Sequence, residues 1–425
     1  MSPHWSTPLS TIYRGAESEA QQRACLLTPQ SISLFSHFLA NTAGCFAMGP
    51  MNQNPFISIL VPLAQADDLL MHALLAMSGA HLTSNDSSLP GREDVACAAR
   101  MHYSRLIGGL RSEFKDLADD DLIKKERLLR LLLVACHYEA VSGNTYGAIF
   151  GHLGASRHLI KSLVANKSMS NQVGFPGLGL HTLGFSIEMY TYMMLCNTMV
   201  MPAAYQESTV DTFVMSFEEM SQFPTFGSFF AGAHELYQLV PEIADLGSRR
   251  FAEEANGLLQ PSPFVQNMYE SLFDRVSTWT MQPRTRADDK DWELRQCAAE
   301  VWRHALQIYL TASISGSIVP GSVEKATMAF HTIEAFTLVG GLVSSQQNYF
   351  ATMLWPVLVS GSCITQVEGQ ENMSRVFKTA WSGMRHMTLW IEVLQLMWDD
   401  PDPRAYGPYG LMFSMHKHNK VLGIL

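Results

Sequence analysis

Closely spaced cysteine pairs are missing from this sequence of 425 residues. A structural zinc site needs thiolates that converge to about 2.3 Å from the metal, so its cysteines usually stand close together in the sequence. Here no two cysteines form a Cys-x-x-Cys pair, and we expect no zinc cluster. Their odd number and wide spacing also argue against a disulfide framework and favour a reducing compartment. The seven cysteines are Cys25, Cys45, Cys97, Cys136, Cys196, Cys297 and Cys363.

Motifs for catalysis and cofactor binding are missing too. His234 and Glu235 begin like a zinc-protease motif, but Gln238 stands where the second histidine would have to be. The glycines of residues 174–184 lack the spacing of a dinucleotide fingerprint, and no strand is expected before them. The sequence therefore predicts no bound metal, no cofactor and no catalytic residue that a motif would identify.

Positive charge is scarce. The chain has 29 basic and 39 acidic residues, which gives a net charge of −10. Phosphate backbones repel such a chain unless a basic patch is segregated on its surface. The densest basic stretch, residues 124–130, is interrupted by Glu126 and follows three aspartates, a pattern typical of a helix start with a solvated face. We find no basic patch in the sequence and expect no direct DNA binding.

Strand signals are weak, because no long run alternates apolar and polar residues around a hairpin turn. Hydrophobic residues make up 47% of the chain and recur with helical spacing. We predict an all-α fold, with a flexible polar leader at residues 1–30 and one large domain of antiparallel helix pairs at residues 31–425. Beyond the opening segment, helices are expected near residues 122–141, 145–165, 181–201, 228–247, 264–279, 290–315, 322–342, 346–367 and 371–398.

One segment is long and apolar enough to cross a membrane. Residues 183–201 are rich in methionine, tyrosine and leucine and have the length of a bilayer span. They also carry Glu188 and Asn197, and polar groups of this kind are costly in lipid. We therefore predict a buried core helix and no membrane association.

Methionine and aromatic residues offer a possible apolar pocket. The chain has 24 methionines, whose flexible side chains suit an adaptable interior. Residues from three distant segments could meet across the core and enclose a hydrophobic small molecule. The same pattern is typical of ordinary helix packing, which remains the alternative. The candidate pocket residues are Tyr190, Tyr192, Met194, Trp302, Tyr309 and Trp355.

Five sequence blocks carry a resemblance to a known family. Residues 34–82 contain an apolar stretch, a loop with Asn54-Pro55-Phe56, and a long apolar segment that ends in Ala-His-Leu. Further blocks follow in order at residues 152–160, 234–246 and 303–314, and the most specific is Leu-Trp-Pro with a small-residue helix at residues 354–364. In order and spacing they resemble the helical regulatory domain of fungal zinc-cluster transcription factors.

The resemblance implies a regulator of transcription in the nucleus. The family's DNA-reading zinc cluster is expected to be absent here, so the chain would act through another transcription factor or a second copy of itself. A gene cluster for a secondary metabolite is the expected target. The alternative is a cyclase or isomerase that needs no metal and uses an apolar pocket of the same fold, because orientation and exclusion of water require no sequence motif. His81 and His152 are expected in the core or at a cap, with ligand contact as the alternative.

Overall fold

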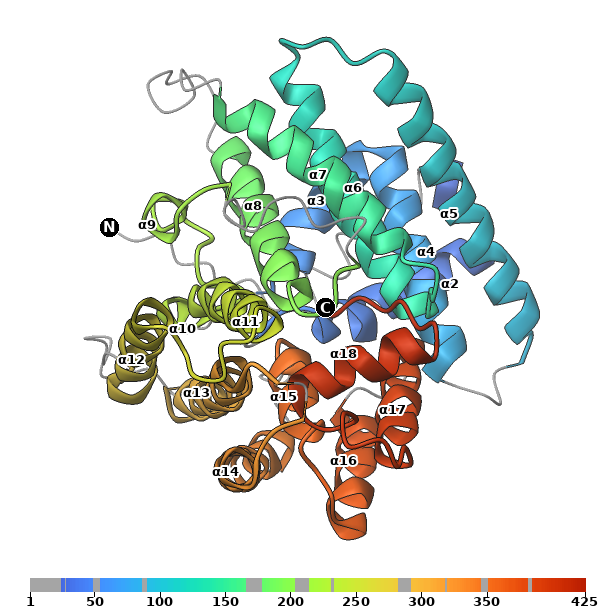
Figure 1. Cartoon of the computed structure of the whole chain (residues 1–425). Coiled ribbons are helices and arrows are strands. Elements are labelled where there is room, and N and C mark those ends of the chain that lie inside the picture. Colours follow the sequence, from blue (N-terminus) through green and yellow to red (C-terminus); the bar gives the residue numbers. More distant parts are fainter. Residues whose placement is uncertain are drawn as a thin grey trace.

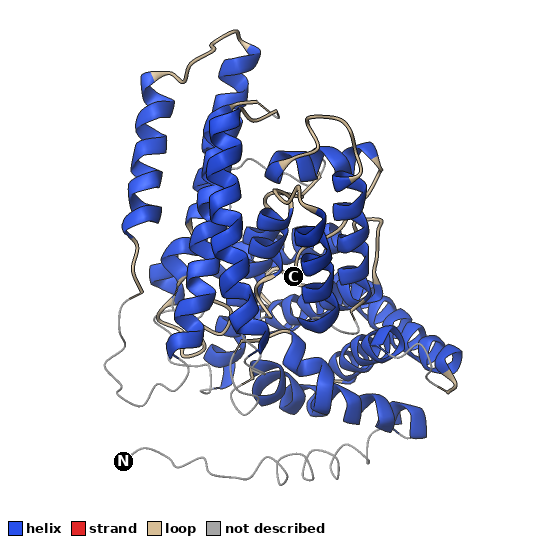
Figure 2. Cartoon of the chain, turned by 90° about the horizontal axis from the view of Figure 1, so that it is seen from below, coloured by secondary structure: helices blue, strands red, loops and turns tan. Residues whose placement is uncertain are grey.

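The computed structural model describes residues 24–26, 28–48, 54–85, 90–165, 178–202, 214–230, 233–281, 292–317, 319–344, 351–380 and 384–425. Most of these residues are helical (Figures 1 and 2). Within these ranges there is no strand, and one isolated parallel bridge joins Tyr146 to Val421. The predicted all-α fold is confirmed.

The first half of the chain forms the helices that run from blue to green in Figure 1. They are η1 (Ala24–Leu26), α2 (Pro29–His37), η2 (Phe38–Thr42), η3 (Ala43–Cys45), η5 (Phe56–Leu60), α3 (Val61–Ala66), α4 (Asp68–Asn85), α5 (Arg92–Lys115), α6 (Leu122–Ser142), α7 (Ala148–Ala165) and α8 (Leu178–Asn197).

The second half forms the helices that run from yellow-green to red. They are α9 (Phe217–Met220), α10 (His234–Tyr237), α11 (Leu239–Ala255), α12 (Pro263–Thr278), α13 (Trp292–Ser315), α14 (Ser322–Ser344), α15 (Leu354–Gly361), α16 (Val367–Ala380), α17 (Arg385–Trp398) and α18 (Gly407–Lys417).

Consecutive helices pack against each other in pairs, as the sequence predicted. The most extensive pairings join α4 with α5, α6 with α7, and α13 with α14. The C-terminal segment, drawn in red, returns to the first half of the chain (Figure 1). There the side-chain amide of Asn197 donates to the carbonyl of Ile424 at 2.7 Å and accepts from its N–H at 2.8 Å. These two hydrogen bonds therefore join the C-terminal segment to the first half of the chain.

The start of α4 shows how one carboxylate fixes the beginning of a helix. The Oδ1 of Asp67 accepts from the backbone N–H groups of Leu69 and Leu70, at 3.0 and 3.3 Å. A carboxylate in this position satisfies donors that the first helical turn leaves unpaired. Arg127 on α6 donates two hydrogen bonds to the same carboxylate, from Nε at 2.5 Å and from Nη2 at 2.8 Å. One aspartate thus caps α4 and ties it to α6.

Helix α8 confirms the buried core helix predicted for residues 183–201. Glu188 is 1% exposed, and its Oε1 accepts from the N–H groups of Gly227 and Phe229 at 3.0 and 2.8 Å. Burial raises the pKa of Glu188 to about 8. A carboxyl group in this apolar helix therefore serves a neighbouring loop of the protein.

Three expected helices have different bounds. The helix expected at residues 228–247 begins only at His234, because Glu188 holds the turn around Gly227 and Phe229 in a loop, and it is interrupted at Gln238 between α10 and α11. Of the helix expected at residues 346–367, residues 346–350 lie outside the described residues. The described part is helical as α15 from Leu354 to Gly361, and the carbonyl of Ser362 beside its end accepts from the N–H of Gly407 at 2.9 Å. The single helix expected at residues 371–398 is two helices, because Met384 is extended.

The two ends of the chain differ in what the structure describes. Residues 1–23 and 27, most of the expected leader, lie outside the described residues. Residues 24–26 of that leader form η1, where Cys25 and Leu26 are buried. At the other end, α18 and the buried side chains of Leu422 and Ile424 form a packed tail.

Candidate functional site

Four of the six candidate pocket residues lie in one continuous row of aromatic rings. The rings of Trp302 and Trp355 stack at 4.8 Å with 7° between their planes. Tyr237 lies 3.9 Å from Trp302 on the other side, and Tyr192 lies 6.4 Å from Tyr237. Tyr309 meets the edge of Trp355 at 5.9 Å. The structure therefore brings residues from α8, α13 and α15 together, as the sequence predicted.

Among the three cavities described here, none of ligand size is lined by this row. Tyr192 lines a cavity of about 10 Å³, which is at the lower limit of what one water molecule needs. Tyr190 and Met194 are buried on α8, and neither lines this cavity or the two larger ones described below. The same holds for Trp302 and its neighbour Trp355. The aromatic row is packed core.

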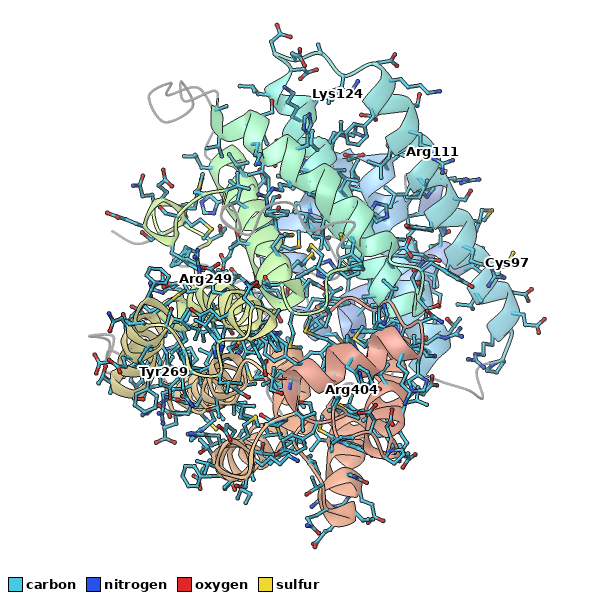
Figure 3. The ribbon with its side chains drawn as sticks, in the orientation of Figure 1. Cys97, Arg111, Lys124, Arg249, Tyr269 and Arg404 are labelled. Carbon is cyan, nitrogen blue, oxygen red and sulfur yellow. The ribbon has the colours of Figure 1, made fainter. Side chains whose placement is uncertain are left out.

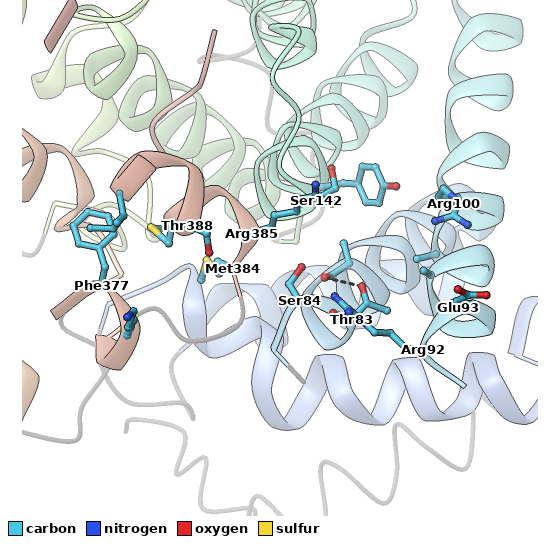
Figure 4. Close-up of a pocket in the computed structure, with 17 residues that line it drawn as sticks. Thr83, Ser84, Arg92, Glu93, Arg100, Ser142, Phe377, Met384, Arg385 and Thr388 are labelled. Atoms are coloured by element: carbon cyan, nitrogen blue, oxygen red, sulfur yellow. Dashed lines mark hydrogen bonds between the residues drawn. The ribbon is translucent and has the colours of Figure 1, made fainter. Parts of the chain in front are cut away.

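The largest of these three cavities has a volume of about 960 Å³ and lies between α5 on one side and α16 and α17 on the other, with the ends of α4 and α6 in its wall (Figure 4). We call it the basic cavity. It is lined by Ala80, Thr83, Ser84, Arg92, Glu93, Ala96, Ala99, Arg100, Tyr138, Ser142, Phe377, Lys378, Met384, Arg385, Met387, Thr388 and Ile391.

Positive charge is concentrated around the basic cavity. Arg92, Arg100, Lys378 and Arg385 line it, against a single carboxylate, that of Glu93. In the part of the chain that the structure describes, no ion pair joins any of these four basic side chains to an acid. The expectation that the chain has no basic patch is therefore wrong, because α5 and the α16–α17 pair are far apart in the sequence and meet only in the fold.

Two glycines let neighbouring segments approach closely next to these charges. A Cβ atom added to Gly79 on α4 would lie 2.6 Å from the Cβ of Ala99 on α5, so the two helices approach closely there. At the end of α6, Gly143 has a φ of +77° and caps the helix. A Cβ atom on this glycine would lie 2.8 Å from the Cγ of Arg385. The absence of a side chain at residue 143 lets Arg385 lie against the helix end.

A second cavity of about 620 Å³ adjoins the first, because both are lined by Arg100, Tyr138 and Ser142. We call it the tyrosine cavity. The rings of Tyr103 and Tyr138 stack here at 3.8 Å. Burial, assisted by the nearby Glu139 carboxylate, raises the pKa of Tyr138 to about 12. Both hydroxyl groups therefore stay neutral donors at physiological pH.

A polar group lies at the edge of the tyrosine cavity. The hydroxyl of Tyr103 donates to the carboxylate of Glu139 and lies 3.1 Å from the Nε2 of His152. Burial and the bond to Glu139 raise the pKa of Tyr103. Arg111 also lines the cavity and projects outward from α5 (Figure 3). The carboxylate of Glu139, which also lines this cavity, is thus hydrogen-bonded to Tyr103 at its edge.

The two histidines singled out in the sequence have different surroundings. His81 is 3% exposed, and its Nδ1 lies 3.1 Å from the hydroxyl of Thr42 and 3.2 Å from the Nε2 of His37. His81 is a core residue that joins α4 to the opening segment. His152 lies beside Tyr103 at the edge of the tyrosine cavity. The sequence therefore pointed to one residue near the site but did not point to the arginines that line it. Within the described residues, no group of three or more histidine, cysteine, aspartate or glutamate side chains could hold a metal ion.

Comparison with known proteins gives a family for this arrangement of helices. The model of the fungal specific transcription factor domain matches residues 33–407. The transcriptional activator protein UGA3 of Saccharomyces cerevisiae is 28% identical over 69 residues, which cover 16% of this chain and 13% of that relative. The alignment therefore spans a small part of the relative's length. No solved structure matches the chain.

Proposed function

Because this chain belongs to the fungal specific transcription factor domain family, we propose that it regulates the transcription of a gene cluster from the nucleus through a partner protein. The family match over residues 33–407 is the observation that carries this proposal. A gene cluster for a secondary metabolite is the target that we propose. The similarity to a transcriptional activator supports the same direction over a short segment.

Charge supports the proposed partner. The 425 residues carry a net charge of −10. The basic cavity is recessed between helices and offers four basic side chains, whereas specific DNA binding draws on many phosphate contacts along an exposed surface. The chain would therefore reach a promoter most readily through a second protein.

Helix α14 offers a surface for such pairing with a second copy of the chain. Its exposed apolar side chains include Val323, Phe330 and Ile333, which are 73%, 57% and 65% exposed. With the exposed Ala326 and Thr337 they recur at spacings of three and four residues, which is the seam of a coiled coil. An identical helix carries the same spacing and can pack against this seam.

Among the described helices, α14 is also the one whose length and composition would allow it to cross a membrane, over Ser322–Val343. Its inner face packs on α13 and buries Met328, Ala335 and Val339. Glu324 and Glu334 add charges that are costly in lipid. These observations favour a protein partner for the exposed seam.

Changing Phe330 to glutamate is expected to abolish self-association. A carboxylate in the middle of an apolar seam would lose its hydration when two copies pair, at a large cost in free energy. The variant should therefore be a monomer where the wild-type chain is a dimer. Light scattering over a range of protein concentrations measures the mass directly. The control is Leu259→Glu, because Leu259 is 85% exposed in the loop between α11 and α12, outside α14. A monomeric wild-type chain, or dimers that survive in the Phe330 variant, would reject α14 as the interface.

Deleting the gene is expected to lower the transcripts of neighbouring genes together. Sequencing of total RNA from the deletion strain, the parent and a strain carrying the restored gene measures this effect. The restored wild-type gene should return the transcripts, and the Phe330→Glu variant should not. If the transcripts stay level while one unrearranged metabolite accumulates, and the purified protein converts that metabolite, the chain is an enzyme and the regulator proposal fails.

A further inference from the structure

In the described part of the chain, the charges of the basic cavity are not paired with acids. Some exposed arginines elsewhere on the protein form close ion pairs, such as Arg275 with Glu242 at 2.5 Å and Arg404 with Asp402 at 2.6 Å. Within the described residues, Arg100 and Arg385 have no hydrogen bond or ion pair to any acid. Like charges that share a cavity repel each other, and a bound anion would relieve that repulsion.

The same cavity is also lined by apolar side chains. Tyr138, Phe377, Met384 and Met387 are buried residues that line it, and Ile391 is half-buried. Serine and threonine hydroxyls at residues 83, 84, 142 and 388 add neutral hydrogen-bonding groups. In Figure 4, Arg92 and Arg100 come from α5, Arg385 and Thr388 come from α17, and Ser142 lies between them. Cationic and apolar walls therefore face one space.

The size of this space selects a small molecule. Cavities that hold small organic ligands have volumes of about 300–1,000 Å³ and combine apolar walls with a few polar groups. The volume of about 960 Å³ is at the upper end of that range. A guanidinium group matches a carboxylate with two parallel hydrogen bonds. A recessed site of this kind suits one anionic group with an apolar body, and a DNA backbone would need a line of phosphate contacts.

We infer that the basic cavity binds a small organic carboxylate with an aliphatic or aromatic body. Its carboxylate contacts Arg100 and Arg385, and its apolar body lies against Tyr138, Phe377 and Met387. Lys378 and Arg92 add to the positive potential around the entrance. The ligand bridges α5 and α17, so its binding would stiffen the contact between the two halves of the chain. This site is independent of the α14 surface and of the regulatory role proposed above.

Binding is tested on the purified full-length chain with sodium octanoate as the probe. Isothermal titration calorimetry and thermal unfolding are measured with octanoate, 1-octanol, octyl phosphate, inorganic phosphate and a short DNA duplex. We expect octanoate to bind and to raise the unfolding temperature. 1-Octanol lacks the charge and inorganic phosphate lacks the apolar body, so each should bind at least about 10-fold more weakly, a loss of one charge-assisted contact or of the apolar contact.

Variants assign the binding to this cavity. Arg100→Gln and Arg385→Gln should each weaken octanoate binding by about 10-fold, since each removes one guanidinium. Ala96→Phe should weaken it as much without changing any charge, because the new ring would occupy the space beside α5. The matched control is Arg375→Gln, which removes an exposed arginine from α16 outside the cavity and should leave the affinity unchanged.

Several results would overturn the inference. These are no binding of octanoate, equal binding of octanoate and 1-octanol, equal binding of octanoate and inorganic phosphate, or equal losses in the Arg375→Gln control. Preferential binding of the DNA duplex would show that the basic cavity binds a nucleic acid and not a carboxylate. Tighter binding of octyl phosphate than of octanoate would show that its ligand is a phosphate monoester. Circular dichroism of each variant verifies that it is folded, so a lost signal can be assigned to the site.

Discussion

Replacing Trp302 by alanine is expected to lower the free energy of unfolding by about 3–5 kcal/mol, the range for removing a large aromatic side chain from a core. Trp302 is fully buried between Tyr237 at 3.9 Å and Trp355 at 4.8 Å. Its removal leaves a cavity at the centre of the aromatic row, and the neighbouring rings lose their contacts on one side. Because whole domains are stable by only about 5–15 kcal/mol, this single change should bring the protein close to unfolding at 37 °C.

Two controls separate lost volume from other effects. Trp302→Phe keeps an aromatic ring and removes an indole N–H that has no hydrogen-bond partner among the described residues, so it should cost far less than alanine. Phe264→Ala removes a ring that is 63% exposed and should stay within about 1 kcal/mol of wild type. Urea unfolding followed by circular dichroism gives the midpoint and the slope. A Trp302→Ala variant as stable as the Phe264 control would show that the row is not close-packed.

The fold class could be predicted because apolar spacing is a local property. Helix α5 shows the reason: Ala99, Leu106 and Leu110 recur at helical spacing in the sequence, and all three are buried in the structure. Asp67 immediately precedes the apolar segment that forms α4, and it caps that helix, since a carboxylate favours the N-terminal end of any helix. Such features depend on residues within one or two turns of each other.

Helix ends could not be predicted where distant residues decide them. The sequence around Gly227 and Phe229 gives no sign that Glu188, about 40 residues earlier, accepts both backbone N–H groups. Ser362 likewise ends its helical segment beside Gly407, which belongs to the C-terminal part of the chain. Tertiary hydrogen bonds override local helical preference at these positions.

The candidate site was missed for a similar reason. The sequence suggested that Trp302, Tyr309 and Trp355 could meet the segment around residues 190–201 across the core, and the structure places their rings in contact with one another. Whether such rings enclose a cavity depends on all their neighbours at once, which no local pattern contains. The basic cavity draws Arg100 and Arg385 from helices far apart in the chain, so no local count of charges reveals it.

Lowering the pH from 7 to about 4 is expected to unfold the chain cooperatively, through histidines that are neutral in the folded state. Burial is the main cause of the lowered pKa of each, which is about 3 for His386 and about 4 for five others. Two histidine pairs join neighbouring helices: His72 and His102 at 2.8 Å between Nδ1 atoms, and His304 and His331 at 2.9 Å. The five others are His37, His102, His137, His304 and His331.

The sign of the effect follows from proton binding. A histidine in the unfolded chain binds a proton near pH 6.5, whereas the folded protein resists that proton until about pH 4. The stability that these groups contribute is therefore present above pH 6.5 and is lost as the pH falls from about 6.5 towards 4. For the fully buried His137 alone, the difference amounts to about 3 kcal/mol. Glu188 acts in the opposite direction, because its raised pKa favours folding as the pH falls from about 8.

Acid unfolding followed by circular dichroism and by tryptophan fluorescence tests this expectation. Replacing His331 by glutamine keeps a polar side chain opposite His304 but removes one titrating group, so the acid midpoint should move down by a few tenths of a pH unit. His416→Gln is the control, because His416 is exposed near the end of α18, and its midpoint should equal that of wild type. If both variants unfold at the wild-type pH, protonation of the His304–His331 pair does not set the acid limit. A chain that stays folded at pH 3.5 would contradict the expectation that protonation of these histidines sets the acid limit.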